Sequence, residues 1–203
     1  MQQKNSKKSS EASDTSDLWN LGGPVWINFT NSLVLANKGM MDVTGSPGAL
    51  IWWLDTMGIF APAKLEPKDL LFAAGLRESF SRVLDNLQAG TPQTLADLAL
   101  INCVLKDQRS WSEIDQLESG AFVEHVRRAS DTIQQAVGLL VFSLCETLTK
   151  GDLTRLRTCA HPDCVLRFYD DSKNGSRKWC SMSECGNRAK ATAFLDRKRS
   201  KTK

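Results

Sequence analysis

Apolar residues recur every three or four positions along much of the chain, which predicts amphipathic helices. The clearest stripe follows Pro67 and consists of Phe72, Leu76, Phe80, Val83, Leu84 and Leu87. Gly90 ends this predicted helix. Another helix is predicted from Ser46, where a hydroxyl cap precedes Pro47 at the first helical position, and Gly58 ends it. The pattern therefore predicts a mainly α protein.

Two more helices are predicted downstream. Thr91 and Pro92 repeat the cap-plus-proline signal and lead into leucines at helical spacing. The longest helix is predicted over residues 121–149, because its apolar stripe is almost unbroken up to the stop at Gly151. The polar stretch 109–120 between these helices predicts a small β-ribbon or a loop.

Four cysteines near the C-terminus change this picture. Cys159 and Cys164 form one pair, Cys180 and Cys185 another; four residues lie within each pair and fifteen between them. Thiolates are strong zinc ligands, and a closed tetrahedral site needs four of them. The spacing therefore predicts one structural Zn²⁺ held by these cysteines.

The residues around the cysteines predict a treble-clef-like zinc finger, formed by a knuckle, a β-hairpin and a helix. The hairpin is expected to pair residues 165–169 with residues 177–179 across a turn at Asn174 and Gly175, since Asn-Gly supplies the positive φ of a tight turn. A run rich in Ala, Lys and Arg follows Cys185 and has good helix propensity.

This segment resembles the CGNR zinc finger, which usually follows a helical domain called ABATE in proteins described as stress-induced transcription regulators. The matching residues are the two-cysteine knuckle, Phe168, Asp170, Ser172, Arg177, Trp179-Cys180-Ser181 and Cys185-Gly186-Asn187-Arg188. Residues 26–32 resemble the start of ABATE, with Asn28 and Ser32 replacing the usual Asp and Thr. Leu76-Arg77-Glu78 resembles another ABATE signature. The resemblance implies a sensor domain, and the expected small-molecule effector site is bordered by Asn31, Trp53 and Arg77.

The cysteines and His161 admit other interpretations. A disulfide pair is disfavoured because no secretory signal precedes the cysteines, and a reducing cytoplasm is the expected location. His161 is an alternative ligand but lies inside the knuckle turn, so it is interpreted as an outer polar residue. Cys103 and Cys145 lie in apolar helical contexts and are interpreted as core residues.

Charge divides the chain unevenly. The first 150 residues carry a net charge of −4, whereas residues 151–203 carry thirteen basic and six acidic residues, a net of +7. The predicted organisation is a disordered N-terminus (1–17), a helical domain (18–150) that opens with an extended or helical segment at 25–29, and the finger with its basic helix (151–203). No apolar run is long enough to span a bilayer.

The basic arm predicts binding to a polyanion, and the resemblance points to DNA. Contacts are expected mainly with phosphates, and the candidate residues are Arg177, Lys178, Arg188, Lys190, Arg197, Lys198, Arg199 and Lys201. The alternative is a zinc-stabilised protein-interaction module whose basic tail only faces solvent. A homodimer is compatible with the sequence.

Catalysis is not expected. The sequence contains no Gly-rich phosphate loop and no carboxylate pair at a recognisable catalytic spacing. A four-cysteine zinc site is coordinatively closed and leaves no position for an activated water.

Overall fold

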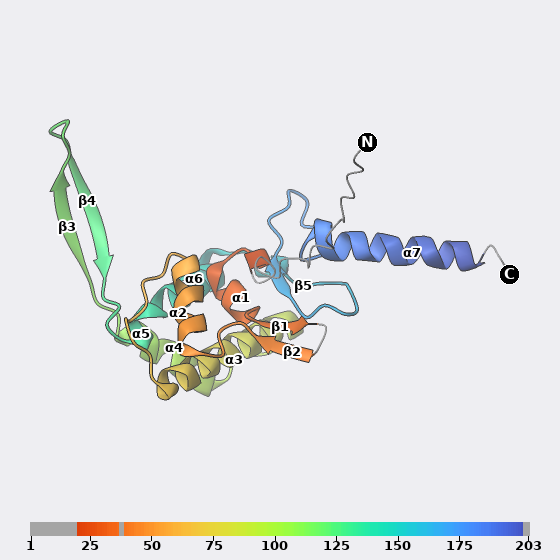
Figure 1. Cartoon of the computed structure of the whole chain (residues 1–203), viewed down its shortest axis with the longest axis horizontal. Helices are drawn as coiled ribbons and strands as arrows, with labels where there is room; N and C mark the ends of the chain where they lie inside the picture. The colour runs from red at the N-terminus through yellow and green to blue at the C-terminus, as the bar shows by residue number, and fades with distance from the viewer. Residues whose placement is uncertain (1–19, 37–38, 201–203) are drawn as a thin grey trace, which may run out of the picture.

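The computed structural model describes residues 20–36 and 39–200. It shows a helical body from which a β-hairpin and a C-terminal helix project at opposite ends (Figure 1). The predicted disordered segment 1–17 and Lys201 lie outside the described residues. In the part of the chain that is described, no helix is both long and apolar enough to cross a membrane.

The core of the body forms around α1 (Val25–Thr30), the segment whose structure the sequence left open. This short helix packs against α3 (Pro67–Ala89) and α6 (Gly138–Lys150). Trp26 and Phe80 meet edge to face with ring centroids 6.0 Å apart, and the Trp26 indole donates to Thr147 Oγ1 at 2.9 Å. Large buried aromatic side chains therefore anchor the N-terminal segment between the two longer helices.

Most helix boundaries lie where the capping signals predict them. Ser46 caps α2 (Pro47–Thr56), with its hydroxyl accepting the Ala49 N–H at 3.3 Å. Pro67 opens α3, and Gly90 ends it in the left-handed region with φ 69°. The helix α4 (Leu95–Lys106) begins later than expected, because Thr94 rather than Thr91 supplies the cap.

The predicted helix over 121–149 is wrong in its first part. Residues Phe122–Arg128 form strand β4, which pairs antiparallel with β3 (Ser110–Gln116), so the ribbon expected at 109–120 is real but larger. Phe122 and Val126 are four residues apart, which places them on one face of a helix and equally on one face of a strand. Helix resumes only at α5 (Ile133–Ala136), where Thr132 provides a side-chain cap.

The finger also forms its hairpin differently from the prediction. Strand β6 (Arg167–Tyr169) pairs with β5 (Leu156–Thr158), which lies before the first cysteine. Residues 177–179 form no strand. The first cysteine pair therefore lies in the connection between the two strands. Of the second pair, Cys180 lies in the loop that follows β6, and Cys185 lies just before α7 (Asn187–Ser200).

Short elements complete the chain. Strands β1 (Leu33–Ala36) and β2 (Gly39–Asp42) form a hairpin beside α3. A 3-10 turn, η2 (Leu153–Arg155), follows the predicted stop at Gly151 and is capped by Asp152. A π-helical turn, η3 (Met182–Gly186), carries the last cysteine directly into α7.

Candidate metal centre and nucleic-acid interface

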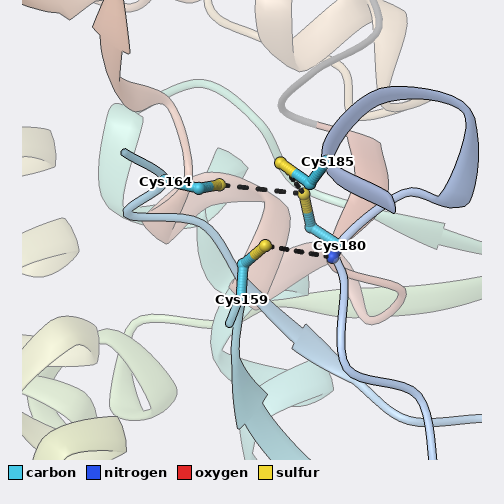
Figure 2. Close-up of side chains that lie close together, drawn as sticks. All are labelled: Cys159, Cys164, Cys180 and Cys185. Atoms are coloured by element: carbon cyan, nitrogen blue, oxygen red, sulfur yellow. Dashed lines mark hydrogen bonds between the residues drawn. The ribbon is translucent and has the colours of Figure 1, made fainter. Parts of the chain in front are cut away.

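The four predicted ligands come together in the finger. The sulfurs of Cys159, Cys164, Cys180 and Cys185 all lie within 4.8 Å of one another (Figure 2). The Cys180 Sγ is 3.8 Å from the Cys164 Sγ and 3.6 Å from the Cys185 Sγ. A tetrahedron with metal–sulfur bonds of about 2.3 Å has edges of about 3.8 Å. The donor set therefore fits one structural Zn²⁺, with all four coordination positions supplied by protein.

Crowding of the thiols separates their pKa values. The pKa of Cys164 is lowered to about 5, first because its sulfur accepts a hydrogen bond from Cys180. That same hydrogen bond, together with burial, raises the pKa of Cys180 far above its usual range. Burial raises the pKa of Cys185 to about 11. Zinc binds cysteine in the thiolate form, so the lowered pKa of Cys164 favours metal binding.

Two groups outside the ligand set stabilise negative sulfur. The Cys180 backbone N–H donates to the Cys159 Sγ at 3.4 Å, and Arg188 donates to the Cys185 Sγ at 3.1 Å. Arg188 therefore contacts a metal ligand directly. Its guanidinium offsets part of the charge that four thiolates bring to the site.

The remaining cysteines and the knuckle histidine are not part of the sulfur cluster. Cys103 is exposed on α4, which corrects its interpretation as a core residue, and Cys145 is half-buried on α6. His161 is buried, and its Nδ1 accepts the Asp163 N–H at 3.2 Å. It therefore serves the knuckle turn from inside and is not an outer surface residue.

Asp170 and Arg177 organise the loop that leads to the second cysteine pair. The buried Asp170 carboxylate accepts the Ser172 hydroxyl at 2.5 Å and the backbone N–H groups of Ser172 and Arg177. These bonds, the Ser172 hydroxyl first, lower the pKa of Asp170. The Arg177 guanidinium donates to the carbonyls of Trp179 and Cys180 and lies 4.5 Å from the centroid of the Phe168 ring. The Arg177 guanidinium therefore stabilises the finger itself through these contacts.

The finger is held against the body by Asn31. Its side-chain amide donates to the Arg167 carbonyl at 2.8 Å and accepts the Arg167 N–H at 2.9 Å. This pairing imitates a neighbouring strand at the edge of β6. The Arg167 side chain continues the contact by donating to Ser81 and Asp85 on α3, each at 2.5 Å. Sequence alone gives no signal for Arg167, because its partners lie more than eighty residues away.

Two known family models match the helical body and the finger separately. The model described as "Putative stress-induced transcription regulator" (ABATE) matches residues 23–151, and the CGNR zinc finger model matches residues 155–198. The chain belongs to the ABATE family. A search of curated proteins finds no match.

The ABATE signature residues serve the architecture of this chain. Asn28, which replaces the usual Asp, accepts the Gly22 N–H at 2.8 Å and donates to Asn20 Oδ1 and to the Gly23 carbonyl. A carboxylate could not donate those last two bonds. The amide therefore secures the chain that enters α1.

The three residues expected to border an effector site have different surroundings. Arg77 lines a hollow of about 350 Å³ together with Asp42 and residues of α3, but neither Asn31 nor Trp53 lines it. The Asn31 side chain is hydrogen-bonded to the backbone of Arg167 in the finger. Trp53 is buried against Phe29, with ring centroids 5.3 Å apart. A shared ligand site bordered by these three residues remains a prediction.

Arg77 is occupied by four contacts inside the protein. Its guanidinium donates to both carboxylate oxygens of Asp42, at 2.6 and 2.5 Å, and to the hydroxyls of Ser32 and Thr44. Burial alone would raise the pKa of Asp42, but the bonds from Arg77 and Thr44 outweigh it and lower that pKa. The network joins α3 to the β1–β2 hairpin.

The predicted DNA-binding residues fall into three groups. Lys178, Arg188, Lys190, Arg197 and Lys198 are exposed. Arg177 is engaged within the finger, as described above. Arg199 lies in the last turn of α7 with its side chain outside the description, and Lys201 lies beyond the described residues.

Proposed function

We propose that this protein is a DNA-binding transcription regulator in which the zinc finger presents α7 to the duplex. The observation that carries the proposal is the placement of this helix. It spans fourteen residues, begins two residues after the zinc ligand Cys185, and projects away from the body (Figure 1). Every described side chain on it is exposed except Ala189, which is half-buried. The DNA major groove is wide enough to admit such a helix.

One face of α7 combines positive charge with an aromatic ring. At 100° per residue, Lys190, Phe194, Arg197 and Lys198 fall within a sector of about 100°. Phe194 is 60% exposed. Isolated helices of this length are marginal in water, so an exposed basic helix gains stability when a partner surface covers it.

The chemistry of this face favours contacts to the phosphate backbone. Lys and Arg neutralise phosphates and release counterions, which supplies affinity without sequence selection. Arg188, in the first turn of α7, adds positive charge at the start of the helix, and Lys178 is exposed in the loop that precedes it. The Phe194 ring offers an apolar contact of the kind that thymine methyl groups accept.

An interaction module remains the second candidate, favoured by the exposed Phe194 and Leu195 on α7, at 60% and 52%. In both readings the metal has a structural role, since four cysteines fill its coordination positions and none is left to activate water. Both place it in the cytoplasm, where the thiols stay reduced.

Replacing Lys190, Arg197 and Lys198 together by Gln tests DNA binding. If each residue meets one phosphate, the slope of log affinity against log salt should become less steep by about 2.7. From 1 M down to 0.1 M salt this difference amounts to about two to three orders of magnitude in affinity. Fluorescence anisotropy with a labelled duplex at several salt concentrations measures both quantities.

The matched control replaces three exposed lysines of the body, Lys64, Lys106 and Lys150, by Gln. It changes the net charge equally and should leave the slope as in the unmodified protein. Equal losses in both variants would indicate a general charge effect. Unchanged affinity of the α7 variant, with zinc retained, would favour the interaction module.

A further inference from the structure

One side of α7 faces away from the finger (Figure 1). Ala189 is the single half-buried residue among the side chains described on this helix, so its side is the one that the rest of the finger covers most. At 100° per residue, the opposite side carries a stripe of exposed residues at spacings of four, three and four. The stripe spans about 60° and consists of Asn187, Ala191, Phe194 and Lys198.

The residues of this stripe and its borders suit contact with base edges as well as with phosphates. Lys190 and Arg197 lie along one border, whereas the acidic residue of α7, Asp196, lies on the Ala189 side. The small side chain of Ala191 lets a nucleic acid approach the helix closely and can contact a thymine methyl group. Asn187 is the member of the stripe whose side chain both donates and accepts hydrogen bonds.

The side-chain amide of Asn187 is held in a defined orientation. Its Nδ2 donates to the carbonyl oxygen of Ser183, four residues earlier in η3, at 3.0 Å. A carbonyl oxygen only accepts, so this bond distinguishes the amide nitrogen from the amide oxygen. The nitrogen keeps a second N–H, and the Oδ1 accepts no hydrogen bond from any residue that the structure describes. Asn187 therefore offers a donor and an acceptor next to each other.

Adenine is the base that presents the complementary pair on its own edge of the major groove. Its N7 accepts a hydrogen bond and its N6 amino group donates one, whereas guanine presents two acceptors there. Helices that enter the major groove commonly contact base edges with their N-terminal residues. Asn187 is the first residue of α7, so it occupies the position from which such contacts are made.

We propose that Asn187 recognises an adenine in the major groove through a bidentate pair of hydrogen bonds. Its Nδ2 donates to adenine N7, and its Oδ1 accepts from the adenine N6 amino group. Ala191 and Phe194, next along the stripe, contact methyl groups of neighbouring thymines. This inference rests on the proposed function and adds sequence selection to it, because contacts to phosphate carry none.

Selection from a pool of random duplexes by the intact, zinc-loaded protein tests the inference. The selected sites should share an adenine, and another base at that position should weaken binding by about 5- to 150-fold. Asn187→Ala should make the affinities for the four bases nearly equal there, with an unchanged salt slope because Asn carries no charge. The matched control is Thr192→Ala, which removes an exposed polar side chain outside the stripe and should keep the adenine preference.

A modified base tests the contact itself. The base 7-deazaadenine pairs normally but has carbon in place of the N7 acceptor. Placed in the selected site, it should weaken binding of the unmodified protein by about 5-fold or more and leave binding of Asn187→Ala unchanged. Zinc content, measured for both proteins, verifies that the finger is intact.

The two proposals fail in different ways. Salt-dependent duplex binding without an adenine preference would overturn the role of Asn187 and leave the proposed function intact. The same conclusion would follow from an adenine preference that survives Asn187→Ala, or from equal effects of 7-deazaadenine on both proteins. Absence of duplex binding by the zinc-loaded protein would overturn both proposals.

Discussion

Cys180→Ser should abolish zinc binding and unfold the finger while the helical body stays folded. A hydroxyl is a poor substitute for a soft thiolate, and the sulfur of Cys180 lies within 3.8 Å of two other ligands. The finger core beyond the cysteines is small: buried Leu166 and Phe168, with Val34 contributed by the body. Structural zinc contributes about 10–16 kcal/mol to such domains, so a core of this size cannot replace it.

Metal analysis after dialysis against a chelator, combined with hydrogen exchange, measures this effect. We expect about one zinc per chain in the unmodified protein and almost none in the variant. Protection should be lost over residues 155–198 and kept in α3 and α6. Cys103→Ser is the matched control, because Cys103 lies on α4 outside the sulfur cluster and should leave zinc content unchanged. Full zinc occupancy in Cys180→Ser would refute the ligand assignment.

Arg77→Leu should destabilise the helical body by about 3 kcal/mol. The Arg77 side chain is only 8% exposed, and its loss leaves Asp42, Ser32 and Thr44 without their shared donor. Asp42 is 32% exposed, which places the expected cost at the low end for a broken buried ion pair. Urea unfolding measures the change, and Lys68→Leu on the same helix, 77% exposed, should cost little.

The Arg77 effect should also depend on pH. The pKa of Asp42 is lowered in the folded state, so the pair contributes its full stability above the unfolded value near 3.8. That contribution is lost as the pH falls through the lower, folded value. The stability gap between the unmodified protein and Arg77→Leu should therefore be constant near neutrality and shrink in acid. A variant as stable as the unmodified protein at neutral pH would instead leave Arg77 available for a ligand.

Local chemistry made the metal centre predictable from the sequence. Cysteine spacing alone places two sulfurs on each of two turns, and the structure confirms that all four converge. Helix ends at Gly90 and Gly151 were predictable for the same reason, since capping depends on a few adjacent residues.

Strand partners were less predictable, because pairing depends on residues distant in sequence. The finger strand β6 has a close candidate partner at 177–179, but it pairs with β5 on the other side of the knuckle. Residues 122–128 fit a helical stripe and a strand face equally, and their pairing with 110–116 decides between them.

Contacts between the helical body and the finger could not be predicted from neighbouring residues in the sequence. Asn31 matched a family signature and was expected near a ligand, yet its amide holds β6 of the finger. Arg177 counted as a basic residue in the charge balance, but its guanidinium binds the finger's own carbonyls. Composition counts charges, whereas burial and hydrogen bonding decide which charges are available to a partner.

The most direct test of a zinc-organised DNA-binding finger is a salt titration of duplex binding by the intact, zinc-loaded protein, repeated after zinc removal by a chelator. Arg188 is engaged with the Cys185 sulfur. Four other exposed basic residues, Lys178, Lys190, Arg197 and Lys198, predict a slope of log affinity against log salt of about −3.6 if each meets one phosphate. Zinc removal should weaken DNA binding strongly, because the zinc ligand Cys185 fixes the position at which α7 begins. A slope near zero, or equal affinity with and without zinc, would contradict the proposal.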